Sequence, residues 1–173
     1  ARPHRMNTPE LREQCARQLT AAASRAGQLT VFAGLDGFVD EILHAVDKRD
    51  NAESFQRVTT LAKLGQRIAA AAGQSTNIEL VNQRTKLGGN GPILANALAS
   101  FGLRVIYLGA LGYPNVHPVF ASFGQRAEIY SIGEPGHTDA LEFEDGKLML
   151  GKTIQLKDVN WKNLPPPETK NLA

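Results

Sequence analysis

The sequence predicts an α/β fold built on a mainly parallel sheet. Segments with helical periodicity alternate with short apolar runs along the 173-residue chain, an order typical of helices packed on a sheet. Two partly polar segments, at about 41–47 and 77–85, do not fit such a core. We therefore expect them to form a separate small sheet that projects from the core, and the chain is long enough for one domain.

Each predicted element follows from its own local signals. Thr8-Pro9-Glu10 combines a capping hydroxyl, a proline at the first helical position and an acid in the first turn, which is a typical helix start. The apolar run 29–35 predicts a strand buried on both faces, and Asp145-Gly146 between alternating runs predicts a hairpin. The predicted elements are, in chain order, a helix at 10–26, strands at 29–35 and 41–47, a helix at 53–72, an edge strand at 77–85, a helix at 91–101, a strand at 104–110, a short helix near 117–124, a strand at 127–132 and a hairpin over 139–150.

A glycine-rich loop, Gly88-Gly89-Asn90-Gly91, directly precedes the predicted helix over 91–101. Glycine lets the backbone approach a ligand closely, and the first N–H groups of a helix have no partner within the helix. The loop matches neither the dinucleotide-binding pattern nor the P-loop pattern. We interpret it as binding a neutral polar ligand through backbone N–H groups and the Asn90 amide, with a tight strand-to-helix turn as the alternative. The residues expected on the buried side of the helix are Ile93, Leu94, Ala97, Leu98 and Phe101.

Two carboxylates, Asp36 and Asp40, follow the apolar strand at 29–35. Ligands of open α/β sheets bind beyond the carboxyl ends of the strands. Ionised acids at that place accept hydrogen bonds from paired hydroxyls, which suits a polyol or a ribose. The alternative is a solvated turn, because Asp and Gly are common turn residues.

Composition narrows the class of partner. The net charge is +2, and the basic residues are scattered rather than clustered, so we expect no nucleic-acid partner. We also expect no membrane partner, because no apolar run approaches 20 residues. The single cysteine, Cys15, and the absence of a secretory signal fit the cytoplasm. The four histidines share no metal-ligand spacing, so we predict no metal site in this chain.

Together these segments resemble the ribokinase family, also called the PfkB carbohydrate kinases. The family's first signature is matched by the loop Gly88-Gly89-Asn90, the helix end Phe101-Gly102 and the strand end Gly109-Ala110-Leu111-Gly112. Asp40 matches the family's substrate-binding acid. Thr138, with the hairpin that follows it, lies where the family has a Pro-Thr segment and a strand pair. The resemblance covers roughly residues 29–150.

The resemblance implies a three-layer α/β/α sandwich with a small β-sheet lid over the substrate. The lid strands would lie at about 41–50 and 76–87. The implied activity is transfer of the ATP γ-phosphoryl group to a sugar hydroxyl, with Mg²⁺ as the metal cofactor. Lids of the family often pair, so the resemblance also implies a homodimer through the lid. The substrate-binding residues would be Asp36, Asp40, Gly88, Gly89 and Asn90.

The chain departs from the family in two places. Gly112-Tyr113-Pro114 stands where members usually have Gly-Asp-Asp, which leaves the substrate class open. The second signature, Asp-Thr-x-Gly-Ala-Gly-Asp, which carries the catalytic base and the anion hole, is absent. We therefore expect residues 1–173 to be the N-terminal, substrate-binding part of an incomplete ribokinase-like domain, without the ATP-binding half, without a catalytic residue and inactive by itself.

Three alternative functions remain open at this stage. A nucleoside kinase would need an aromatic wall for the base, for which Phe38 is a candidate. A non-catalytic sugar-binding module would keep the substrate half alone. An unrelated α/β domain would use the glycine loop only as a turn.

Overall fold

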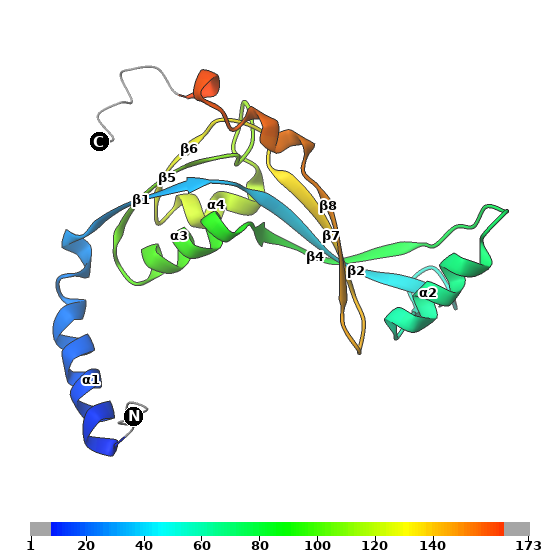
Figure 1. Ribbon diagram of the computed structural model, residues 1–173, viewed down its shortest axis with the longest axis horizontal. Helices are drawn as coiled ribbons and strands as arrows, with labels where there is room; N and C mark the ends of the chain where they lie inside the picture. Colours follow the sequence, from blue (N-terminus) through cyan, green and yellow to red (C-terminus); the bar gives the residue numbers. More distant parts are fainter. Residues whose placement is uncertain (1–7, 165–173) are drawn as a thin grey trace, which may run out of the picture.

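The computed structural model describes residues 8–164, and two separate sheets organise them (Figure 1). The helices are α1 (Pro9–Ala23), α2 (Leu61–Ala70), α3 (Asn90–Ser100) and α4 (Ala121–Gly124), with short 3₁₀ turns at Ala26–Gln28, Pro118–Phe120, Ile154–Asp158 and Trp161–Asn163. The strands are β1 (Thr30–Leu35), β2 (Phe38–Arg49), β3 (Phe55–Arg57), β4 (Leu80–Gly88), β5 (Arg104–Gly109), β6 (Glu128–Ser131), β7 (Gly136–Glu142) and β8 (Lys147–Lys152). The predicted α/β class with a parallel sheet is confirmed.

The first sheet is fully parallel and has the order β1-β5-β6. Helices α3 and α4 lie on the same side of it (Figure 1). Tyr107 and Phe123 meet edge to face in the core between the sheet and these helices, with ring centroids 5.4 Å apart. The buried core residues are Ala95, Ala99, Val105, Tyr107, Leu111, Phe120 and Phe123.

The prediction that the strand at 29–35 is buried on both faces is wrong for the described residues. Val31 and Ala33 are half-buried, and Ala33 packs against the core below α3. Phe32, which points to the opposite face, is 53% exposed. Among the described strands, β1 is also an edge strand, since it pairs there with β5 alone. An apolar run therefore identified the strand but not how many of its faces the described chain covers.

The predicted buried side of the helix at 91–101 is wrong for Ile93, Leu94, Ala97 and Phe101, which are exposed, whereas Leu98 does pack against the core. The buried residues of α3 are Pro92, Ala95 and Ala99, whereas Leu94 and Phe101 are 58% and 73% exposed. Small side chains let the helix lie close to β1 and β5. Ile93, Leu94 and Phe101 consequently remain exposed, whereas Leu98 packs against the core.

The second sheet has five strands around the long central strand β2. Strands β3 and β4 pair with β2 in antiparallel fashion, β7 pairs with it in parallel, and β8 forms an antiparallel hairpin with β7. The sheet contains both partly polar strands that the sequence set apart and the predicted Asp145-Gly146 hairpin. It extends away from the first sheet (Figure 1), and we call it the projecting sheet.

The projecting sheet has a hydrophobic core of its own, covered by α2. The predicted helix at 53–72 is wrong in its first part, because Phe55–Arg57 is the short strand β3 and the helix begins only after Thr60, whose hydroxyl accepts the N–H of Lys63 at 3.2 Å. Apolar spacing could not separate these two elements. The buried residues of this second core are Leu43, Ala45, Val58, Leu64, Leu141 and Phe143.

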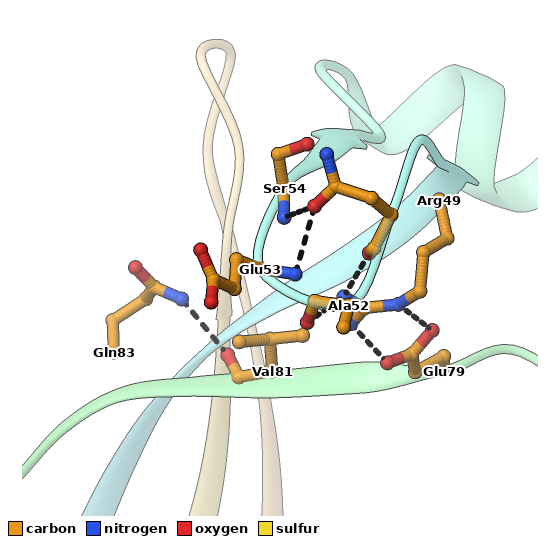
Figure 2. A network of polar contacts seen from close by, with 8 residues as sticks. Arg49, Ala52, Glu53, Ser54, Glu79, Val81 and Gln83 are labelled. Carbon is orange, nitrogen blue, oxygen red and sulfur yellow. Dashed lines mark hydrogen bonds and ion pairs between the residues drawn. The ribbon is translucent and has the colours of Figure 1, made fainter.

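A polar network holds the far end of the projecting sheet together (Figure 2). The Arg49 guanidinium binds both carboxylate oxygens of Glu79 and donates to the carbonyl of Ala52 at 3.1 Å. The Asn51 side chain accepts the N–H groups of Glu53 at 2.9 Å and Ser54 at 2.8 Å. The turn between β2 and β3 is thereby tied to the segment that leads into β4.

Candidate functional site

The junction of the two sheets brings together the residues that the sequence predicted as a site. Strand β1 ends at Leu35, and β2 begins at Phe38, so only Asp36 and Gly37 form the turn. The glycine loop at the end of β4 lies beside this turn, because β4 pairs with β2 in a register that joins Gly88 to Phe38. Residues about fifty positions apart in sequence thus meet at the carboxyl edge of the first sheet.

Asp36 binds the glycine loop directly. Its Oδ2 accepts the N–H of Asn90 at 3.0 Å, and its Oδ1 accepts the N–H of Gly91 at 2.9 Å. The Tyr107 hydroxyl donates to the carbonyl oxygen of Asp36 at 2.6 Å. Two of the N–H groups that the sequence predicted for a ligand therefore already have a partner within the protein.

Asp40 lies inside β2, whereas the sequence predicted that the second strand begins only at residue 41. It is only 9% exposed. Within residues 8–164 its carboxylate makes no hydrogen bond, and its only ionic contact is with Nζ of Lys86, 3.9 Å from Oδ2. A buried carboxylate normally has hydrogen-bond donors around it. The Asp40 carboxylate therefore has unused acceptor capacity.

Gly88 makes room for this carboxylate. A Cβ atom placed on Gly88 would lie 2.4–2.5 Å from the Asp40 carboxyl carbon and oxygens, which is far closer than any stable contact. The close approach explains why a residue without a side chain is required at this position. The loop backbone and the carboxylate consequently line the same small space.

Register pairing places further groups on the same face of the projecting sheet as Asp40. Lys86 and Thr138 are its partners on β4 and β7, while Phe38 and Gly88 form the pair two residues closer to the first sheet. We call this surface, made by Phe38, Asp40, Lys86, Gly88, Gly136 and Thr138, the Asp40 face. It combines a carboxylate acceptor, a hydroxyl and an ammonium donor, a set suited to binding the hydroxyls of a small polar molecule.

Thr138, which the family resemblance placed in a Pro-Thr segment, is a further candidate for this site. It lies within β7, which begins at Gly136, and it is only 7% exposed. Its hydroxyl makes no hydrogen bond within the described residues. The signal available in the sequence was a polar residue in an alternating strand, but only the register of β7 with β2 places it beside Asp40.

The remaining predicted site residues lie at the start of α3. Gly89 has a φ of 91° and is half-buried, and Asn90 is exposed. The Asn90 side chain makes no hydrogen bond within residues 8–164, so its amide is available to a ligand. The structure thus brings Asp40, the glycine loop and Thr138 together, and it places Asp36 on the loop's inner side.

Two histidines meet on the opposite face of the projecting sheet. The rings of His117 and His137 lie 6.4 Å apart and nearly perpendicular. They line a cavity of about 540 Å³ together with Val39, Glu41, Thr85, Pro118 and Val119. Because side chains alternate along a strand, this cavity is separated from the Asp40 face by β2 itself.

The residues present do not fit the ATP and Mg²⁺ that the family resemblance implies. Among residues 8–164, no group of three or more His, Cys, Asp or Glu side chains could hold a metal ion. The N–H groups of the glycine loop bind the Asp36 carboxylate, so they are not free to bind a phosphate.

Among residues 8–164, no helix has the length and apolar character needed to cross a membrane.

Comparisons with known proteins identify relatives. Residues 6–167 match a family model described as prokaryotic ketohexokinase. A ketohexokinase from Haloferax volcanii is 33% identical over 136 residues, which are 78% of this chain and 36% of that protein. The chain therefore spans about a third of the length of this curated relative.

Matches to solved structures carry less similarity in sequence. A nucleoside kinase from Methanocaldococcus jannaschii, described as an archaeal member of the ribokinase family, is 12% identical and has a TM-score of 0.43 over 79% of this chain and 40% of its own. A ribokinase from Arabidopsis thaliana is 14% identical, with a TM-score of 0.35 over 72% of this chain and 36% of its own. The family match carries the assignment and confirms the predicted resemblance to carbohydrate kinases: this chain belongs to the prokaryotic ketohexokinase family.

Proposed function

We propose that the whole protein transfers the γ-phosphoryl group of ATP to a hydroxyl of a ketohexose, and that this chain binds the sugar. The observation that carries the proposal is the Asp40 carboxylate, which is buried and yet accepts no hydrogen bond within residues 8–164. The family match and the Haloferax volcanii relative favour a ketohexose over a nucleoside. This chain spans about a third of the length of that relative, so the proposed substrate and activity belong to the whole protein.

Sugar hydroxyls supply the hydrogen-bond donors that the Asp40 carboxylate lacks. Two neighbouring hydroxyls can donate to its two oxygens, and hydrogen bonds to an ionised acceptor are about twice as strong as neutral ones. The low exposure of Asp40 limits competition by water, which strengthens these bonds further. Thr138 and the Lys86 ammonium offer a hydroxyl and a donor to the remaining sugar oxygens.

The glycine loop forms the second wall of the proposed sugar site. Gly88 keeps the backbone against the carboxylate, and Gly89 and Asn90 continue this wall toward α3. The exposed Asn90 amide can both donate to and accept from a hydroxyl. This arrangement fixes the orientation of a neutral polyol without requiring a charged group on it.

The ATP site and the catalytic base belong, in this proposal, to a part of the protein outside this chain. Phosphoryl transfer requires groups that position the phosphates and neutralise their charge, and the described residues do not fit that task. We therefore expect the 173-residue chain by itself to show no ATP-dependent turnover. Sustained phosphorylation of a sugar by the isolated chain would contradict this division.

We further propose that the projecting sheet acts as a lid over the sugar and pairs with a second copy of the protein in the cytoplasm. The exposed strand β8, with Met149 and Leu150 each about half exposed, is compatible with such pairing. Light scattering of the full-length protein tests the dimer. A monomer at micromolar concentration would contradict it.

The replacement of Asp40 by asparagine tests the sugar site. Asp40→Asn keeps the shape of the side chain and removes its charge, so affinity for D-fructose should fall by about 10- to 100-fold. The measurement is isothermal titration of the full-length protein, with adenosine as the competing candidate ligand. Asp50→Asn, directly after the far end of β2, is the matched control and should bind as the wild type does. Unchanged fructose affinity in Asp40→Asn would remove the basis of the proposal.

A further inference from the structure

Asp36 and Asp40 are only four residues apart, but their surroundings differ in kind. The Asp40 carboxylate is without hydrogen bonds in the described chain, whereas both oxygens of Asp36 accept backbone N–H groups. We infer that Asp36 is a positioning residue that holds the glycine loop in place through α3 and Tyr107, and is not itself a sugar ligand. This inference rests on the proposed sugar site and refines it.

Helix α3 depends on Asp36 because it lacks a capping side chain of its own. Its N-cap residue is Gly89, which has none. The N–H groups of Asn90 and Gly91 would otherwise have no acceptor in the helix. Asp36 supplies that acceptor from the β1–β2 turn, 54 residues earlier in the chain, and its negative charge is favourable at the positive end of the helix dipole.

The loop encloses the Asp36 carboxylate on two sides. A Cβ atom on Gly89 would lie 2.8 Å from Oδ2, and one on Gly91 would lie 2.4 Å from Oδ1. The Tyr107 hydroxyl lies 3.4 Å from Oδ1 as well. Each oxygen is therefore packed against the loop backbone, which leaves the adjacent space to the protein rather than to a ligand hydroxyl.

Tyr107 ties this arrangement to the core. It is fully buried in β5, packs on Phe123, and donates its hydroxyl to the Asp36 carbonyl at 2.6 Å. Burial raises the pKa of Tyr107 far above its usual value, and the charge of Asp36 adds to this effect, so the hydroxyl remains a donor. Asp36 thereby connects three segments: the β1–β2 turn, the start of α3, and β5.

Loss of the hydrogen bonds of Asp36 should move the whole glycine loop relative to Asp40. A direct sugar ligand affects one hydroxyl of the substrate, whereas a residue that positions a wall affects every hydroxyl that the wall contacts. The two roles are therefore separated by removing sugar hydroxyls one at a time. This is a double-mutant cycle in which the second change is made in the ligand.

The experiment measures dissociation constants of the full-length protein for D-fructose and its monodeoxy analogues. Asp36→Asn retains one acceptor oxygen and loses the charge, and it should weaken D-fructose binding by about 10-fold, the scale of one or two hydrogen bonds lost where the displaced loop meets the sugar. The same factor, within about twofold, should apply to every analogue. The penalty of Asp40→Asn should shrink for at least one analogue. Tyr107→Phe should act in the same direction as Asp36→Asn, and the double variant should be less than additive.

Matched controls and a second measurement keep the outcomes distinct. Tyr130→Phe, at a half-buried position of strand β6, is the control for Tyr107→Phe, and Asp50→Asn is the control for Asp36→Asn. Hydrogen exchange of the Asn90 and Gly91 amides should accelerate in both test variants. If Asp36→Asn does not fold, Tyr107→Phe carries the test.

A penalty of Asp36→Asn that disappears for one deoxy analogue would identify Asp36 as a direct ligand and overturn the inference, while the proposed function stands. Wild-type affinity in both Asp36→Asn and Tyr107→Phe would overturn it as well. Failure of the wild-type protein itself to bind D-fructose would overturn the proposed function, and this inference with it.

Discussion

Replacing Gly88 by alanine should disable the sugar site while leaving the fold intact. The added Cβ would lie 2.4 Å from the Asp40 carboxylate, whereas ordinary contacts begin at 3.4 Å, so the carboxylate must retreat by about 1 Å. Losing a hydrogen bond to a charged acceptor costs about 1.5–3 kcal/mol of binding free energy, so affinity should fall by about 10- to 100-fold. The φ of Gly88 is not positive, so alanine meets no backbone strain there.

The assay is isothermal titration of D-fructose against the full-length Gly88→Ala protein, with circular dichroism to verify folding. Gly65→Ala in α2 is the control, because nothing lies within 4 Å of its Cβ position, and it should gain up to about 1 kcal/mol in stability without affecting the sugar. If the carboxylate is the group displaced, Gly88→Ala should add little to Asp40→Asn. A folded Gly88→Ala protein with less than about threefold loss in affinity would refute the reasoning.

Two further outcomes concern the projecting sheet. Leu64→Ala, in the core below α2, should lower the free energy of unfolding by about 2–5 kcal/mol in urea titrations, because Leu64 is only 4% exposed. Leu19→Ala in α1 is the control, because Leu19 is 72% exposed. Equal losses of stability in the two variants would contradict the second core. Burial and the neighbouring Arg57 lower the pKa of His44, so the unfolded chain binds the proton more tightly and stability should fall as the pH drops through about 6.5 and below. His44→Gln should flatten the melting temperature over that pH range, and an unchanged pH profile would show that His44 does not contribute.

Local signals determined much of the fold. The Thr8-Pro9-Glu10 start and the Asp145-Gly146 turn each predict one element, since capping and turn geometry depend on a few consecutive residues. The glycine loop before α3 was equally visible. These predictions hold because the interactions behind them span only a few positions.

Periodicity failed where two elements share one apolar pattern. Phe55 and Val58 belong to strand pairing and to the core below α2, yet their spacing also fits a continuous helix. Helical spacing predicted a buried side of α3 that included Ile93, Leu94 and Phe101, but the small residues Ala95 and Ala99 face the sheet. In both cases the partner surface, which lies far away in sequence, decided the outcome.

The sequence alone placed two acids and a glycine loop near one another and indicated a carbohydrate kinase. Only the tertiary structure gave the acids different surroundings, with Asp36 on the N–H groups of α3 and Asp40 buried beside Gly88 and Thr138. Residue type and spacing reveal what chemistry a side chain can perform. Which donors reach it depends on strand register and on contacts across about fifty residues, and these are set by the packing of the whole chain.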